Sequence, residues 1–151
     1  VIRRVSELGG ADLRPLVTHR SVPSGEGSDT KCARWSRIAG EAARQCGRIP
    51  MKVLPIASLR EGLVPIEESS IGFVLWEEEG DQSFTALCKN REVPEHVYVL
   101  MGPEGGLSAE EVEWARSLGY ISASLGPRIL RAETAPLAAL TILQSIWGDM
   151  V

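Results

Sequence analysis

Apolar side chains recur at helical spacing in several segments of the chain. Ile2, Val5 and Leu8 follow this spacing and stop at the Gly9-Gly10 pair, a common helix end. A longer apolar stripe follows, which Ser28 or Asp29 can cap and Gly47 would end. We predict helices over residues 1–8, 28–46, 108–118 and 134–147, and a short one at 58–61, where, as at 108–111, the sequence matches a capping box.

Continuous apolar runs between these helices predict strands. Residues 71–76 resemble a strand that is buried on both faces of a parallel sheet, residues 97–101 predict the next buried strand, and residues 120–125 predict a further strand. Shorter strands are predicted at 13–17, where Pro15 favours an edge position, and at 53–56. The alternation of strands and helices predicts an α/β fold with a mostly parallel sheet flanked by helices. The last helix is apolar nearly all round, so it should be buried on several sides, one of which could face a second copy of the chain.

Two loops rich in glycine and proline are the most informative feature. Residues 102–108 read Gly-Pro-Glu-Gly-Gly-Leu-Ser, and residues 125–136 read Leu-Gly-Pro-Arg-Ile-Leu-Arg-Ala-Glu-Thr-Ala-Pro. Each follows an apolar run and precedes a helix, so both should lie at the carboxyl edge of the sheet. Open α/β folds bind small ligands at this edge.

The first loop does not match a phosphate site. It lacks the Gly-Lys-Ser/Thr of a Walker loop and the G-x-G-x-x-G fingerprint, and Glu104 would repel phosphate oxygens. An uncharged or partly cationic ligand fits it better, and a tight turn without a ligand is the alternative. In the second loop, Arg128, Arg131 and Glu133 precede a buried helix, where a glutamate can simply complement the helix dipole and an arginine can simply pair with it.

Composition and charge narrow the class of protein. The length of 151 residues fits one domain, and no apolar run reaches the roughly 18 residues of a membrane span. No secretory signal is visible, and three separated cysteines indicate reduced, mostly packed thiols of a cytosolic protein. His19 and His96 lie in no metal-ligand spacing, so no metal is expected.

The net charge of −4 is unevenly spread, with +4 over residues 1–50, −5 over 51–101 and −3 over 102–151. A solvated helix face explains most of the basic residues. Arg20 differs, because it lies in a predicted loop.

At the two loops the sequence resembles the bacterial 16S ribosomal RNA uridine-N3 methyltransferases, of the SPOUT superfamily. The matching motifs are Gly102-Pro-Glu-Gly-Gly-Leu-Ser-x-Glu-Glu-Val-Glu and Leu125-Gly-Pro-Arg-Ile-Leu-Arg-Ala-Glu-Thr-Ala-Pro-Leu-Ala-Ala-Leu. Ser6-Glu-Leu-Gly-Gly, Pro15-Leu-Val-Thr-x-Arg-Ser and Trp35-x-Arg-Ile-Ala-x-Glu-Ala-Ala-x-Gln-Cys-Gly-Arg agree as well, in the same order along nearly the whole chain. His19 and Cys46 depart from the usual pattern, which often has an acidic residue and a serine there.

The resemblance implies a SPOUT methyltransferase domain over residues 1–151, with a deep trefoil knot near the C-terminus. It also implies a cytoplasmic homodimer that binds S-adenosylmethionine in the knot and methylates 16S ribosomal RNA in the small ribosomal subunit. Family members carry a PUA-like barrel before this domain, and the apolar stripe that runs up to Val1 suggests that something upstream is missing. The implied cofactor-binding residues are Trp76, Gly102, Pro103, Glu104, Gly105, Gly106, Leu125, Gly126, Leu130, Glu133, Thr134 and Ala135.

For the reaction, N3 of uridine must lose its proton before it attacks the methyl group. We hypothesise that an arginine stabilises the negative charge that spreads onto O2 and O4. Arg20 and Arg48 are the first candidates, and Arg131 and Arg128 come next. Two alternatives stay open, namely a non-catalytic dimerising module and a methyltransferase for another RNA position.

Overall fold

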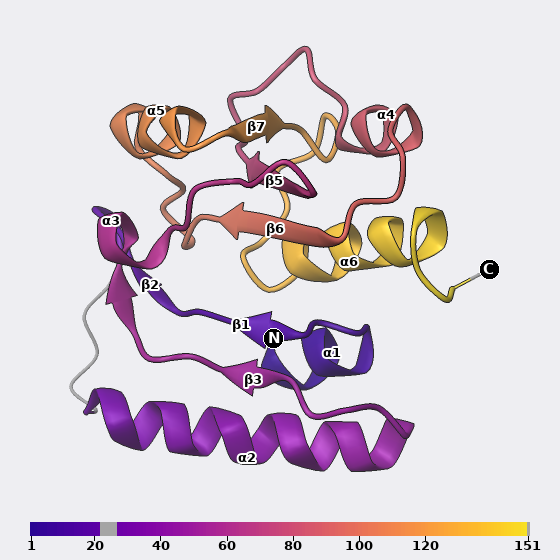
Figure 1. Ribbon diagram of the computed structural model, residues 1–151. Helices are drawn as coiled ribbons and strands as arrows, with labels where there is room; N and C mark the ends of the chain where they lie inside the picture. The colour runs from indigo at the N-terminus through magenta and orange to yellow at the C-terminus, as the bar shows by residue number, and fades with distance from the viewer. Residues whose placement is uncertain (22–26, 151) are drawn as a thin grey trace.

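A three-stranded parallel sheet lies in the upper half of the molecule in Figure 1, a computed structural model that describes residues 1–21 and 27–150. The central strand β5 (Ser70–Leu75) pairs with β6 (His96–Met101) on one side and with β7 (Tyr120–Ala123) on the other. The pairing of Leu75 with both Met101 and Ala123 aligns the carboxyl ends of the three strands. The predicted parallel sheet is confirmed.

Two short parallel ladders lie apart from this sheet. β1 (Asp12–Leu13) pairs with β3 (Lys52–Val53), and β2 (Leu16–Val17) pairs with β4 (Ala57–Ser58). The single strands predicted at 13–17 and 53–56 are therefore wrong, since in each place the structure has two short strands, one before and one after a proline. Pro15 and Pro55 lie at the two breaks, where their missing N–H groups cannot join a ladder.

Six helices are found in the described part of the chain. The prediction missed one of them, α4, although Phe84, Leu87 and Cys88 follow helical spacing behind the Ser83 cap. The cap predicted for α2 is also wrong: Ser28 is the first helical residue, and Gly27 is the N-cap without a side-chain hydrogen bond. The helices are α1 (Ile2–Glu7), α2 (Ser28–Cys46), α3 (Leu59–Gly62), α4 (Phe84–Lys89), α5 (Ala109–Ser117) and α6 (Ala135–Ile146).

The core is divided by the central sheet. Ile71, Phe73 and Leu75 alternate along β5 and pack on one face, against α4 and α6, whereas Val74 packs on the other face, against α5. Phe73 meets Phe84 of α4 edge to face, with ring centroids 4.9 Å apart. This packing covers both faces of β5, as its continuous apolar run predicts.

Helix α6 joins two parts of the core. Ala139 and Leu143 belong to the cluster on the sheet, while Leu137 and Leu140 pack against Val5, Ala39 and Met51 from the first third of the chain. In Figure 1, α6 lies between β6 and the β1–β3 ladder, with α2 beyond that ladder. The prediction that this helix is buried on several sides is confirmed.

Other sequence expectations have mixed outcomes. Cys88 is fully buried and Cys32 is half-buried, but Cys46 is exposed at the end of α2, so the expectation of packed thiols fails there. No helix among residues 1–21 and 27–150 is long and apolar enough to cross a membrane.

Candidate functional site

A cavity of about 840 Å³ lies at the carboxyl ends of the three sheet strands. Three loops form it: residues 76–83 after β5, residues 102–106 after β6 and residues 124–133 after β7. The sequence argument that the two Gly-Pro loops meet at one edge is therefore confirmed. The loop that begins with Trp76, one of the implied cofactor-binding residues, joins them.

Most of the predicted cofactor-binding residues line this cavity. Gly105 and Thr134 are not among the lining residues, although each adjoins one that is. The predicted residues that line it are Trp76, Gly102, Pro103, Glu104, Gly106, Leu125, Gly126, Leu130, Glu133 and Ala135.

The first loop turns tightly enough to require glycine at two positions. A Cβ added to Gly102 would lie 2.9 Å from backbone atoms of Gly106 and Leu107. Gly106 has φ = 72°, in the left-handed region that favours glycine, and its N–H donates to the Pro103 carbonyl at 2.8 Å. An added Cβ there would also overlap the Glu77 carboxylate. The glycines thus let the loop approach the one that follows β5.

Helix α5 holds the loop that follows β5. Arg116 forms ion pairs with Glu79 at 3.2 Å and with Glu113 at 2.6 Å, and its guanidinium lies 6.0 Å from the centre of the Trp76 ring. The pKa of Glu79 is lowered, chiefly by the neighbouring Ser122 hydroxyl, although this hydroxyl lies outside regular hydrogen-bond geometry. The Asp81 amide and Arg116 lower the pKa further. Glu79 is therefore ionised and braces this wall.

The loop after β7 is fastened at both ends. Ser124 forms backbone hydrogen bonds to the segment where the loop after β5 enters α4. Its carbonyl accepts from Phe84 N at 2.9 Å, and its N–H donates to Gln82 O at 2.8 Å. Its hydroxyl accepts from Gly126 N at 3.1 Å. At the other end, Thr134 N donates to Arg131 O at 2.8 Å, which closes a turn into α6. The cavity is therefore built from connected loops.

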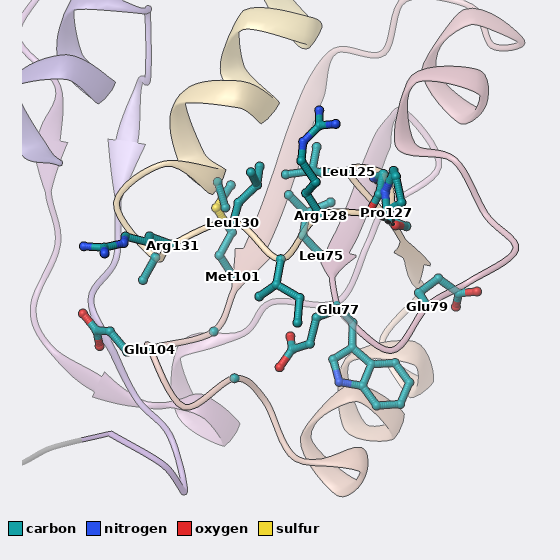
Figure 2. A pocket seen from close by; sticks show the side chains of 18 of the residues that line it. Leu75, Glu77, Glu79, Met101, Glu104, Leu125, Pro127, Arg128, Leu130 and Arg131 are labelled. Carbon is teal, nitrogen blue, oxygen red and sulfur yellow. Dashed lines mark hydrogen bonds between the residues drawn. The ribbon is translucent and has the colours of Figure 1, made fainter.

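The cavity combines an apolar centre with charged walls. Its carboxylates could attract a positive charge, its arginines could bind an anionic group, and its leucine and methionine side chains offer contacts to a flat apolar group. In Figure 2, Leu75, Met101, Leu125 and Leu130 gather in the middle, Glu104 and Arg131 lie on the left, and Glu79 lies on the right.

The structure separates the candidate arginines. Arg131 and Arg128 line the cavity. Arg20 does not, but its Nη1 donates to the Gly105 carbonyl at 2.9 Å, so it adjoins the first loop from outside. Arg48 lies elsewhere, in an ion pair with Asp149. The geometry therefore brings three of the four arginines to the cavity or to the loop that bounds it.

Sequence reasoning did not name several lining residues, among them Leu75, Glu77, Glu79, Asp81 and Met101. All of them end, or follow, strands β5 and β6, which the sequence predicts. The 97–101 run was also expected to be buried, but Leu100 alone is buried in β6, at the edge of the sheet. Among residues 1–21 and 27–150, no three His, Cys, Asp or Glu side chains are grouped so as to hold a metal ion.

Comparison with known proteins links this architecture to RNA modification. Residues 1–144 match the sequence profile of a family described as an RNA methyltransferase domain. The ribosomal RNA small subunit methyltransferase E of Bacillus subtilis is 34% identical over an alignment of 151 positions that covers 95% of this chain and 59% of that protein. The chain thus spans about three fifths of the length of this relative.

Two solved structures superpose closely on the chain. Ribosomal RNA small subunit methyltransferase E from Neisseria gonorrhoeae, bound to S-adenosylmethionine, has a TM-score of 0.87 and 30% identity over 99% of this chain and 61% of that one. A methyltransferase from Legionella pneumophila, in complex with the same cofactor, has a TM-score of 0.83 and 30% identity over the same shares of both chains.

Proposed function

The chain belongs to the RNA methyltransferase domain family, and from this premise we propose that it uses S-adenosylmethionine to methylate N3 of a uridine in 16S ribosomal RNA. The observation that carries the proposal is the 840 Å³ cavity, to which the two loops with the resembling motifs and the loop after β5 all contribute. The names of the similar proteins support the cofactor and the ribosomal substrate. The position on the base comes from the resemblance of the sequence motifs.

The residues present fit this cofactor. Gly102 and Gly106 leave room for a ligand to approach the backbone, which a Cβ would obstruct. Leu125 and Leu130 offer apolar contacts to the adenine ring, and the Glu77 and Glu104 carboxylates would attract the sulfonium or amino charge. Trp76 Nε1 is buried without a hydrogen-bond partner among the described residues, so it remains available to an acceptor. The bound cofactor supplies an electrophilic methyl group.

The protein must favour the deprotonated form of the base. When N3–H loses its proton to solvent, negative charge spreads onto O2 and O4. The N3 electron pair would then form the bond to the methyl carbon, while the bond from this carbon to the sulfonium breaks and a neutral thioether leaves. A guanidinium near these oxygens would lower the barrier electrostatically. Arg131 lines the cavity and Arg20 is held by the Gly105 carbonyl, so these are the two arginines we assign first. Arg48 stays a prediction outside the cavity lining.

We also propose that residues 1–151 form a SPOUT-type domain with a C-terminal trefoil knot and act in the cytoplasm as a metal-independent homodimer. The TM-score of 0.87 supports the fold. The apolar residues Ala138, Ile142 and Trp147 of the α6 region are only half-buried in one copy, which supports a second copy on this face. Light scattering of the chain in solution should give twice the mass of one chain, and the mass of one chain would contradict the dimer.

The first experiment is calorimetric titration with S-adenosylmethionine, followed by methyl transfer to isolated small subunits and nucleoside analysis of the product. We expect micromolar binding and 3-methyluridine. Methylation of another atom or base would contradict the assigned position. Cofactor binding without any transfer would favour the non-catalytic module.

The same assay tests the arginines. Arg131→Ala and Arg20→Ala should each lower kcat about 100-fold or more, as loss of one charge-stabilising donor does, with cofactor affinity little changed. The kcat of Arg48→Ala is measured in the same assay, because Arg48 is also a candidate. Arg91→Ala is the matched control, since Arg91 is exposed and lines neither this cavity nor the one described next. A kcat within a few-fold of wild type would remove that arginine from the mechanism.

A further inference from the structure

A second, smaller cavity of about 210 Å³ lies beside the first loop. It is formed by the end of β2, the start of α3 and the first turns of α5. The function proposed above assigns no role to it. Its lining residues are Val17, Ser58, Leu59, Arg60, Glu110, Glu111 and Trp114.

An aromatic ring and a guanidinium are stacked in this cavity. Arg60 Cζ lies 4.7 Å from the centre of the Trp114 ring, a cation–π contact. Val17 and Leu59 add apolar surface, and Val17 is 55% exposed. Trp114 Nε1 is buried but has no hydrogen-bond partner among the described residues, whereas a buried indole N–H usually has one. Stacked aromatic and guanidinium planes are surfaces on which unpaired RNA bases stack.

The two carboxylates of the cavity differ in their contacts. Glu111 is engaged on both oxygens, because Oε1 accepts from His19 N at 2.7 Å and Oε2 accepts from Ser108 N at 2.9 Å. Glu110 is exposed, and hydrogen bonding to its own amide and to Ser108, followed by the charges of His19 and Arg20, lowers its pKa. It is therefore an ionised acceptor at the cavity edge, suited to N–H donors.

The turn that contains His19 and Arg20 connects the two cavities. His19 N is bonded to Glu111 of the second cavity, while Arg20 Nη1 is bonded to Gly105, between two lining residues of the first. A strand of RNA whose uridine reaches the first cavity would therefore pass close to the second.

We infer that the second cavity holds one unpaired base of the RNA next to the methylated uridine, with the base stacked on Arg60 and Trp114. Its preferred occupant carries an exocyclic amino group, as guanine does at C2, because Glu110 accepts hydrogen bonds and uracil presents a carbonyl oxygen at the corresponding position. This inference rests on the proposed function, since it requires an RNA substrate.

The test follows the four indole N–H signals of the ¹⁵N-labelled chain with S-adenosylmethionine present, and Trp114→Phe identifies the signal of Trp114. The probes are the dinucleotides GpU, UpG and UpU. We expect GpU or UpG to shift the Trp114 signal and to bind more tightly than UpU. Arg60→Ala should weaken this binding about tenfold or more, the usual effect of losing one stacking partner, and Glu110→Gln should reduce the preference for guanine.

Arg91→Ala serves as the matched arginine control. Equal binding by Arg60→Ala and Arg91→Ala, or a Trp114 signal that none of the three RNAs moves, would overturn the inference. The indole signal does not depend on methyl transfer, so a failure of this inference can be distinguished from a failure of the proposed function. An unmoved Trp114 signal in a chain that methylates ribosomal RNA removes the second cavity only. A chain that binds the dinucleotides at Trp114 but neither binds nor transfers from S-adenosylmethionine contradicts the proposed function instead.

Discussion

At the scale of single residues, the site depends on two glycines, because neither has a Cβ atom that would block the turn. Gly102 and Gly106 allow the first loop to fold back on itself and to meet the loop that carries Glu77. The requirement is partly conformational, because Gly106 has a positive φ, and partly steric, because the Glu77 carboxylate occupies the space beside it.

Gly106→Ala should therefore impair the site more than the fold. The strained backbone and the displaced carboxylate should together cost ~1–3 kcal/mol of stability, and affinity for S-adenosylmethionine should fall at least tenfold. Calorimetric titration and thermal unfolding measure the two effects. Gly80→Ala is the control, since Gly80 lines the same cavity but has open space around it. Equal affinities of the two variants would show that the turn at Gly106 does not shape the ligand site.

At the scale of elements, α5 connects both cavities to the first loop. Its capping box is complete: Ser108 Oγ accepts from Glu111 N at 3.3 Å, and Glu111 Oε2 accepts from Ser108 N at 2.9 Å. Glu111 also holds the His19 amide, and Arg116 near the end of the helix holds Glu79. The start of α5 thus fixes the turn beside the second cavity, and its end holds the loop after β5, which lines the first cavity.

Ser108→Ala should destabilise the protein by ~1 kcal/mol, the usual cost of removing an N-cap side chain. Urea unfolding followed by circular dichroism measures the loss. Ser36→Ala is the matched control, because Ser36 is exposed in the middle of α2, where alanine favours the helix. If the two substitutions have the same effect, the capping box contributes nothing to stability.

The elements also show what the sequence could and could not predict. Buried runs and capping boxes gave β5, β6, β7 and α5, because local spacing and local hydrogen bonds determine them. The split strands around Pro15 and Pro55 depend on pairing partners about 40 residues away, and local patterns carry no information about such partners. The cofactor loops were predicted from motifs, but Glu77 was not named, because its role comes from the close approach of Gly106.

At the scale of the whole molecule, three apolar clusters hold the described chain together, and two of them contain a group that can ionise at high pH. Burial raises the pKa of the Cys88 thiol to about 11 and that of Tyr120 to about 12. Cys88 lies in the cluster that contains α4 and α6, and Tyr120 lies in the one that contains α5. Each group is neutral when protonated and charged when deprotonated, and burial disfavours the charged form. The folded state therefore binds these protons more tightly than the unfolded state does.

The free energy of unfolding should therefore fall in alkaline solution. The contribution of both groups is fully present below the unfolded pKa values of 9.0 and 10.0, and it is lost as the pH rises through about 11 and about 12. Urea unfolding at pH 8, 10 and 11 measures the decline. Cys88→Ala is less stable at pH 8 because it leaves a cavity, but its decline between pH 9 and 11 should be shallower than that of wild type. Parallel curves would exclude Cys88 as a source of the pH dependence.

The position of α6 has a consequence for the order of events during synthesis. Leu137 and Leu140 complete the cluster around Val5, and Gln144 Nε2 donates to Leu8 O at 2.9 Å across 136 residues of sequence. Helix α6 is thus translated after all other members of that cluster. A nascent chain must keep Val5, Ala39 and Met51 without the cover of α6 until that helix leaves the exit tunnel, so this cluster cannot be completed before residues 135–146 have been translated.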